Sequence, residues 1–150
     1  MRWFEDFREG EVTEVGPVTV SEDDILSFAQ QFDPQPFHVD AEAARESPFG
    51  GLIASGWHTA AIYMGLFVRG VLEGTASLGS PGVEELRWLA PVRPGDTLRG
   101  RTTVTDVQPS STTPGRGTIF GSHELVNQDG AVVMRFRSRG FIARRPSSGV

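Results

Sequence analysis

Residues 57–73 read WHTAAIYMGLFVRGVLE, and this segment decides the fold. Its charged residues are Arg69 and Glu73, so a helix over this range is apolar on nearly every side. A helix of that kind is buried over most of its surface. Its alanines and glycines keep it thin, so that a sheet can approach it closely. The uncharged run Ala60 to Val68 is too short to span a bilayer.

Four strand-like segments follow this helix and are separated by turn sequences. They lie at 82–90, 97–107, 117–127 and 131–142. The last one alternates, which is typical of a strand with two different faces. One face would carry Val132, Met134, Phe136, Ser138 and Ile142, and the other Val133, Arg135, Arg137, Arg139 and Phe141.

The residues before the central helix predict a strand at 12–20 and two helices. Ser21 is a good N-cap for a helix that runs to Phe32 and ends before Pro34, and Asp40 can cap a short helix at 41–46. The order of one strand, then helices, then four closely connected strands predicts an α+β fold. We expect one domain over residues 1–145, with an antiparallel sheet wrapped round the central helix, and a disordered tail at 146–150.

Composition excludes several kinds of chemistry. The chain has no cysteine, which removes disulfides and thiolate catalysis, and all 14 basic residues are arginine, which removes Schiff-base chemistry. Its three histidines lack zinc-ligand spacing, so we expect no metal site. A net charge of -5 disfavours a nucleic-acid partner. The acidic N-terminus lacks a signal-peptide pattern, so we expect a cytoplasmic protein with no membrane anchor.

Residues 33–56 carry most of the functional signal. Asp33 and His38 lie five residues apart around two prolines, and a glycine-rich stretch then leads to Gly56 at the start of the central helix. An acid beside a histidine can perform acid–base chemistry, and a helix N-terminus offers backbone N–H groups to a polarised carbonyl oxygen. Simpler interpretations stay open: Asp33 ends a helix, His38 bonds a backbone carbonyl, and Gly56 serves a tight helix entry.

Two further groups are candidates for substrate binding. His58 lies in the first helical turn after Gly56 and either lines a pocket or is a packed side chain. Arg135 and Arg137 alternate along the last strand and are candidates for gripping phosphates, because arginine binds phosphate in bidentate fashion. The alternative for this pair is a solvated sheet face.

From about residue 5 to about residue 143, the chain resembles the MaoC-like dehydratases, the R-specific enoyl-CoA hydratases of hotdog fold. The segment 33–40 reads DPQPFHVD, where the family motif has an acid, Asn-Pro and His, and 49–56 reads FGGLIASG. The segment 86–98, LRWLAPVRPGDTL, is similar to the family's strand–turn–strand. Gln35 stands where many members have Asn, and Ser55 where many have His. The family's later helix serine has no clear equivalent.

The resemblance implies reversible hydration of a 2-enoyl-CoA, or acyl-carrier, thioester to a 3-hydroxyacyl thioester. Asp33 and His38 would hold the water, and the Gly56 N–H would hold the thioester oxygen. Gln35 and Ser55 are expected to contact the substrate. No cofactor is needed, because coenzyme A is part of the substrate.

Three further expectations concern assembly and rival functions. A single sheet leaves an open edge and an apolar helix surface, which predicts a homodimer or larger assembly. The same fold also serves thioesterases, since fold does not determine function. A non-catalytic acyl-CoA-binding or partner subunit is the rival from another class.

Overall fold

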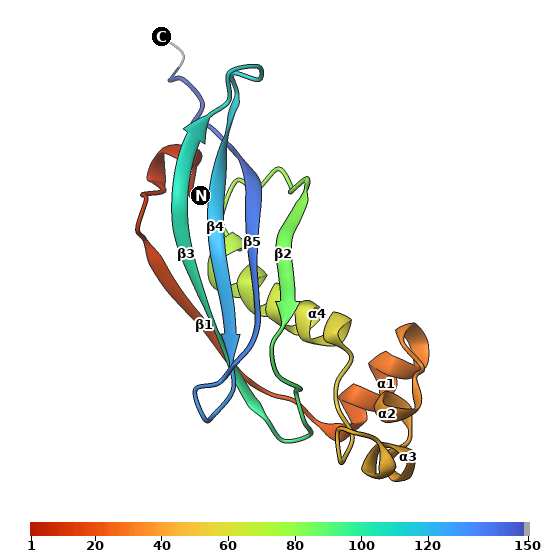
Figure 1. Ribbon diagram of the computed structural model, residues 1–150. Helices are drawn as coiled ribbons and strands as arrows, with labels where there is room; N and C mark the ends of the chain where they lie inside the picture. Colours follow the sequence, from red (N-terminus) through yellow and green to blue (C-terminus); the bar gives the residue numbers. More distant parts are fainter. Residues whose placement is uncertain (149–150) are drawn as a thin grey trace.

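The computed structural model describes residues 1–148; the last two positions of the predicted tail, 149–150, lie outside the described residues. Five antiparallel strands form one sheet in the order β1-β3-β4-β5-β2, and the sheet lies across the helix α4 (Figure 1). The strands are β1 (Val12–Thr19), β2 (Gly82–Trp88), β3 (Thr97–Pro109), β4 (Arg116–Val126) and β5 (Val132–Ala143). This confirms the predicted α+β class.

The helices fall into two groups. A short 3-10 turn, η1 (Phe4–Asp6), precedes β1, and α1 (Glu22–Phe32), α2 (Pro36–Val39) and α3 (Ala41–Glu46) gather beyond one end of the sheet (Figure 1). The central helix is α4 (Gly56–Phe67), continued by a π-helical turn η2 (Val68–Leu72). Together α4 and η2 run from Gly56 to Leu72, so the helix begins and ends one residue before the range 57–73 that the sequence predicted.

Local capping explains where the first group of helices begins. The Ser21 hydroxyl accepts the N–H of Asp24, and the Asp40 carboxylate accepts the N–H groups of Glu42 and Ala43. Both caps satisfy backbone donors that a helix start leaves unpaired. The predicted helix starts at Ser21 and Asp40 are therefore confirmed. The sequence did not predict α2, which begins at Pro36, where the fixed φ of proline suits a first helical position.

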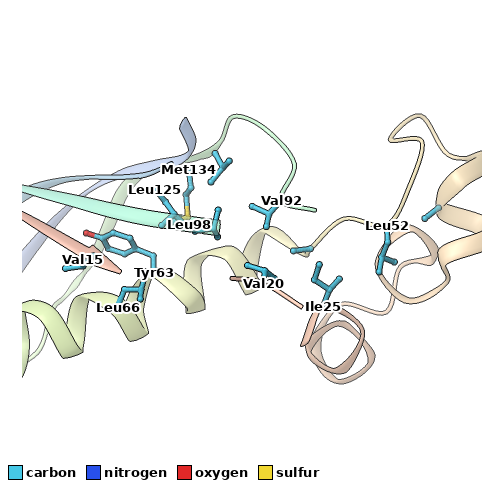
Figure 2. Close-up of a cluster of buried hydrophobic side chains, with 13 residues drawn as sticks. Val15, Val20, Ile25, Leu52, Tyr63, Leu66, Val92, Leu98, Leu125 and Met134 are labelled. Carbon is cyan, nitrogen blue, oxygen red and sulfur yellow. The ribbon is translucent and has the colours of Figure 1, made fainter. Parts of the chain in front are cut away.

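One core runs from the sheet into the helical group. Figure 2 shows Tyr63 and Leu66 of α4 beneath strand residues such as Leu98, and Ile25 and Leu52 at the far end of the same row. Close approach depends on glycine at two positions: an added Cβ would lie 2.5 Å from Val15 at Gly70 and 2.6 Å from Val15 at Gly100. The core therefore fixes α4 against β1 and β3, and fixes the helical group against the N-terminal end of α4.

Two details of burial concern the last strand and the central helix. Val133, which strict alternation places on the same face as Arg135 and Arg137, is fully buried, because the β4–β5 register shifts between Leu125 and Val126. One side of α4 is also uncovered: Trp57 is 60 % exposed and Met64 50 % exposed, because nothing in the single chain packs on that side.

Candidate active site

The His38 ring is held by a backbone carbonyl. It lies in α2, is buried, and its Nδ1 is 2.7 Å from the carbonyl oxygen of Ile53. A carbonyl only accepts hydrogen bonds, so Nδ1 carries the hydrogen and donates it. Nε2 of the neutral ring therefore bears the lone pair and is the atom that can accept a proton.

Asp33 presents its carboxylate to that nitrogen. Its Oδ2 lies 3.4 Å from His38 Nε2 and accepts a 2.7 Å hydrogen bond from the Ser55 hydroxyl, while its Oδ1 accepts a 2.8 Å bond from the Gln35 amide. The hydrogen bond from Ser55 lowers the pKa of Asp33, and Gln35 and His38 act in the same direction against the opposing effect of burial. Asp33 is thus an anion at neutral pH and a weak base.

Gly56 begins α4 with an unpaired backbone donor. The N-cap residue, Ser55, gives its hydroxyl to Asp33 and makes no side-chain cap. Within residues 1–148 the Gly56 N–H has no hydrogen-bond acceptor. A Cβ at this position would lie 2.5 Å from ring carbons of Trp88, so only glycine leaves room for the ring. The N–H is therefore free for a ligand oxygen at the positive end of the helix.

His38 and Gly56 line one groove of about 340 Å³ at this end of α4. Its other walls come from the helical group, from Thr59 of α4 and from the segment after β2. They are largely apolar and include Phe37, Phe49, Ile53, Ala54, Trp88, Leu89, Ala90, Pro91 and Val92. An apolar groove in which a base and a free N–H meet suits an apolar acyl group attached to a carbonyl.

The other candidates from the first half of the chain lie around the groove. Gln35 is exposed and engaged with Asp33. Ser55 is fully buried, and its hydroxyl is directed at the same carboxylate. His58 is buried and stacks on Phe28 with ring centroids 4.7 Å apart, and burial lowers its pKa. Neither Ser55 nor His58 lines the groove.

The arginine pair lies elsewhere. Arg135 and Arg137 are exposed on β5. Met134, which precedes Arg135, and Phe136, which lies between the two arginines, pack into the core. Alternation places the arginines on the sheet face that points away from α4. Arg137 forms a 3.0 Å salt bridge with Glu85. The structure therefore does not bring this pair together with Asp33, His38 and Gly56.

The sequence did not predict three groups that help to form the candidate site. The Ile53 carbonyl fixes the His38 tautomer, Thr59 lines the groove, and Trp88 lies over Gly56. Trp88 and Gly56 are far apart in the sequence, and no local pattern links them. In the part of the chain that is described, no three His, Asp or Glu side chains form a metal site, and no helix is long and apolar enough to cross a membrane.

Residues 6–119 match the family model of the MaoC like domain. A crystal structure of a MaoC-like dehydratase from Rhodospirillum rubrum is 44% identical with a TM-score of 0.90, and the match covers 98% of this chain and 100% of that one. The (R)-specific enoyl-CoA hydratase of Rhodospirillum rubrum is 37% identical over 114 residues, 73% of this chain and 74% of that protein. Bacillus subtilis YdeM is 37% identical over 105 residues, 70% of this chain and 74% of that protein.

Proposed function

Because the chain belongs to the MaoC-like dehydratase family, whose hotdog fold it shares, we propose that it catalyses the reversible hydration of a 2-enoyl-CoA thioester to a 3-hydroxyacyl-CoA thioester. One observation carries the proposal. His38 and Gly56 line the same apolar groove, and the Asp33 carboxylate lies 3.4 Å from the His38 ring. A base, an anion and a free N–H are what addition of water next to a thioester carbonyl requires.

The proposed reaction assigns each group one task. A water molecule hydrogen-bonded to both His38 Nε2 and the Asp33 carboxylate loses a proton to His38 Nε2, and its oxygen attacks the β-carbon of the enoyl group. Electrons of the double bond shift toward the thioester oxygen, where the Gly56 N–H stabilises the negative charge. The proton taken from water is then delivered to the α-carbon, so that H and OH have been added across the double bond.

Ser55 and Gln35 act on Asp33 in this proposal. Their two hydrogen bonds keep the carboxylate ionised and fix its orientation toward His38. An ionised Asp33 accepts a hydrogen of the bound water and stabilises the protonated His38 ring that forms during attack. Ser55 and Gln35 are therefore positioning residues, and neither needs to contact the acyl group.

The test is a panel of 2-enoyl-CoA substrates of graded chain length, followed by loss of absorbance of the conjugated thioester. Hydration of at least one of them without release of free coenzyme A is the expected result. Free coenzyme A from a saturated acyl-CoA would instead show a thioesterase. Binding of enoyl-CoA without any turnover would show a binding or partner subunit.

We also propose that the protein is a homodimer. The exposed side of the central helix carries Trp57 and Met64 of α4 and Val68 of η2, and the edge strand β2 carries exposed Val83 and Trp88. An apolar helix face and an open sheet edge together favour burial against a second copy. Light scattering at micromolar concentration should give twice the chain mass, and a monomer would contradict the proposal.

A charge at Val68, the first residue of η2, should separate the subunits. Val68→Glu places a carboxylate at a position that is 40 % exposed in the single chain. Val12→Glu is the matched control, because Val12 is 45 % exposed on β1 at the opposite edge of the sheet. We expect a lower mass for the first variant and an unchanged mass for the second.

A further inference from the structure

A second hollow lies along the later half of α4, between that helix and the inner face of the sheet. It has a volume of about 260 Å³. Tyr63, Met64 and Phe67 of α4 line one side of it, and Thr102, His123 and Ser138 lie among the residues that line the other. Most of its remaining wall is apolar, so the polar side chains that line it have few other polar groups around them. We call this hollow the inner cavity.

Three of its side chains form a continuous hydrogen-bonded chain. The Tyr63 hydroxyl is 2.6 Å from His123 Nδ1, and His123 Nε2 is 2.6 Å from the Ser138 hydroxyl. Tyr63 and His123 are almost completely buried. A Cβ at Gly121 would lie 2.8 Å from His123 Nε2, so glycine at that strand position leaves the space that the histidine needs.

This chain has one hydrogen more than its internal bonds use. Tyr63, a neutral His123 and Ser138 each supply one hydrogen, and the two bonds between them consume two. If Nδ1 carries the ring hydrogen, the Tyr63 hydroxyl has a hydrogen to donate; if Nε2 carries it, the Ser138 hydroxyl does. Thr102 also lines the inner cavity, and its hydroxyl, which has one hydrogen and an acceptor oxygen, leaves the surplus at one.

A ligand atom that accepts this spare hydrogen should be uncharged. Burial lowers the pKa of His123 to about 4, so the chain carries no charge near neutral pH. The arginines that line the inner cavity are already paired, Arg2 with Glu11 and Arg139 with Glu84. A carboxylate in this hollow would therefore lose its hydration without gaining a cation, whereas a keto or ether oxygen would gain a donor.

The inner cavity and the groove that His38 and Gly56 line both lie along α4. Gly56 and Thr59 line the groove, and Tyr63, one helical turn beyond Thr59, lines the inner cavity. The rise along α4 from Gly56 to Tyr63 is about 10 Å. An acyl chain whose thioester oxygen meets the Gly56 N–H and whose tail follows α4 would place a carbon several bonds from the thioester beside Tyr63.

We infer, on the basis of the function proposed above, that Tyr63, His123 and Ser138 select acyl thioesters whose chain carries a neutral hydrogen-bond-accepting oxygen several carbons beyond the thioester. An unsubstituted chain would fill the inner cavity but would leave the spare hydrogen without an acceptor. A buried donor without a partner is destabilising, so the oxygen-bearing chain binds more tightly.

The test compares saturated thioesters, which bind but have no double bond to hydrate. The probes are octanoyl-CoA and octanoyl-CoA derivatives with an oxo group at successive carbons of the chain, measured by isothermal titration calorimetry. We expect one oxo derivative to bind about fivefold more tightly than octanoyl-CoA. If no oxo derivative binds more tightly, the spare hydrogen is satisfied without substrate, as a trapped water would do, and the inference is overturned.

A variant without the polar chain should lose this preference. Tyr63→Phe/His123→Leu/Ser138→Ala replaces all three partners with apolar groups, which is far less disruptive than removing one of them. It should bind octanoyl-CoA and the oxo derivative equally, or prefer octanoyl-CoA. Ile119→Val is the control, because it removes one methylene from the cavity wall and should leave the ratio unchanged. A triple variant that keeps the preference contradicts the assignment.

A measurement on the unaltered protein does not depend on that variant folding. An oxo thioester that accepts from one end of the chain should favour one His123 tautomer, which the ¹⁵N chemical shifts of its ring nitrogens report, whereas octanoyl-CoA should not. Unchanged shifts with both probes contradict the inference. Hydration of enoyl-CoA without an oxo preference overturns this inference alone, and failure to bind any acyl-CoA overturns the proposed function as well.

Discussion

Two buried histidines lie beside the central helix, and each has polar partners on both ring nitrogens. His38, at the N-terminal end of α4, lies between the Ile53 carbonyl and the Asp33 carboxylate. His123, beneath the sheet, lies between the hydroxyls of Tyr63 and Ser138. The two rings are similarly buried, so the difference between them comes from their partners.

That difference determines what each ring can do. A carbonyl accepts only, so it fixes the His38 tautomer and leaves Nε2 as the basic atom; a nearby anion then stabilises the ring once it is protonated. Hydroxyls both donate and accept, so His123 can adopt either tautomer, and no charge nearby offsets its burial. We therefore expect His38 to transfer protons and His123 to remain neutral.

The largest effect should come from the His38 cluster. Asp33→Asn and His38→Asn keep side-chain size but remove proton transfer, and a general acid–base group typically contributes 10²–10⁴-fold. Each variant should lower kcat for enoyl-CoA hydration by about that factor. Because both groups act on one water, the double variant should be little slower than either single one.

Folding and binding provide the control for these variants. Both should unfold near the temperature of the unaltered protein and should still bind a saturated acyl-CoA. The pH–rate profile should lose the ionisation that belongs to the coupled pair. A folded Asp33→Asn protein that hydrates at nearly full rate would remove this cluster from the mechanism.

The next effect concerns stability and the His123 cluster. Burial lowers the pKa of His123 from 6.5 to about 4, so between these values the unfolded chain takes up a proton that the folded chain does not. The free energy of unfolding should therefore fall as pH drops from 6.5 to 4, by on the order of 3 kcal/mol from this residue. Asp33, whose lowered pKa starts from 3.8, contributes at lower pH.

Urea unfolding measured from pH 7 to pH 4 checks this expectation. His123→Leu should have a shallower dependence on pH than the unaltered protein, whatever its stability at pH 7. His58, whose pKa burial also lowers, is present in both proteins and cancels in the difference. Equal slopes would mean that His123 is protonated in the folded state.

A smaller effect on kcat is expected when the Asp33 carboxylate is kept but the hydrogen bond that orients it is removed. Ser55→Ala removes the 2.7 Å hydrogen bond that lowers the pKa of Asp33. We expect kcat to fall about tenfold, because hydrogen bonds to charged groups contribute about 1.5–3 kcal/mol and only part of that affects the transition state. The acidic limb of the pH–rate profile should move to higher pH. Ser27→Ala, on the exposed side of α1, is the matched control.

The smallest effect should come from the outer face of the sheet. If Arg135 and Arg137 hold coenzyme A phosphates, Arg135→Ala/Arg137→Ala should raise KM more than it lowers kcat, and only by a fewfold, because exposed charges are well screened. The effect should shrink as salt rises. Arg101→Ala is the control, since Arg101 is as exposed as Arg137 and is likewise paired with a glutamate, Glu14, but lies on β3 instead of β5. An unchanged KM would leave the pair as a solvated face.

Local interactions account for what could be predicted. Ser21 and Asp40 cap helices through bonds that reach only two or three residues along the chain, so their sequence context predicted them correctly. The strand ranges came within two residues of those observed, because alternation and turn residues are also local. The same holds for Asp33 and His38, whose proximity follows from five residues of stiff backbone.

Distant contacts account for what could not. The roles of Ser55 and of the Ile53 carbonyl depend on bonds that span 22 and 15 residues, and Ser55, expected to contact substrate, is directed at Asp33. The bond between Tyr63 and His123 spans 60 residues. Nothing near His123 in the sequence distinguishes a structural histidine from one that lines a cavity.

The sequence by itself determined the class of fold and the helix starts at Ser21 and Asp40, and it singled out Asp33 and His38 as neighbouring candidates, because periodicity, capping and proline stiffness act over a few residues. Only the tertiary structure decided which His38 nitrogen is basic, that Trp88 requires glycine at position 56, and that the inner cavity contains a polar chain. The tautomer of a histidine, the burial of a side chain and the shape of a cavity depend on contacts between residues that are distant in the sequence. These contacts form only in the folded structure, through its hydrogen bonds and packing.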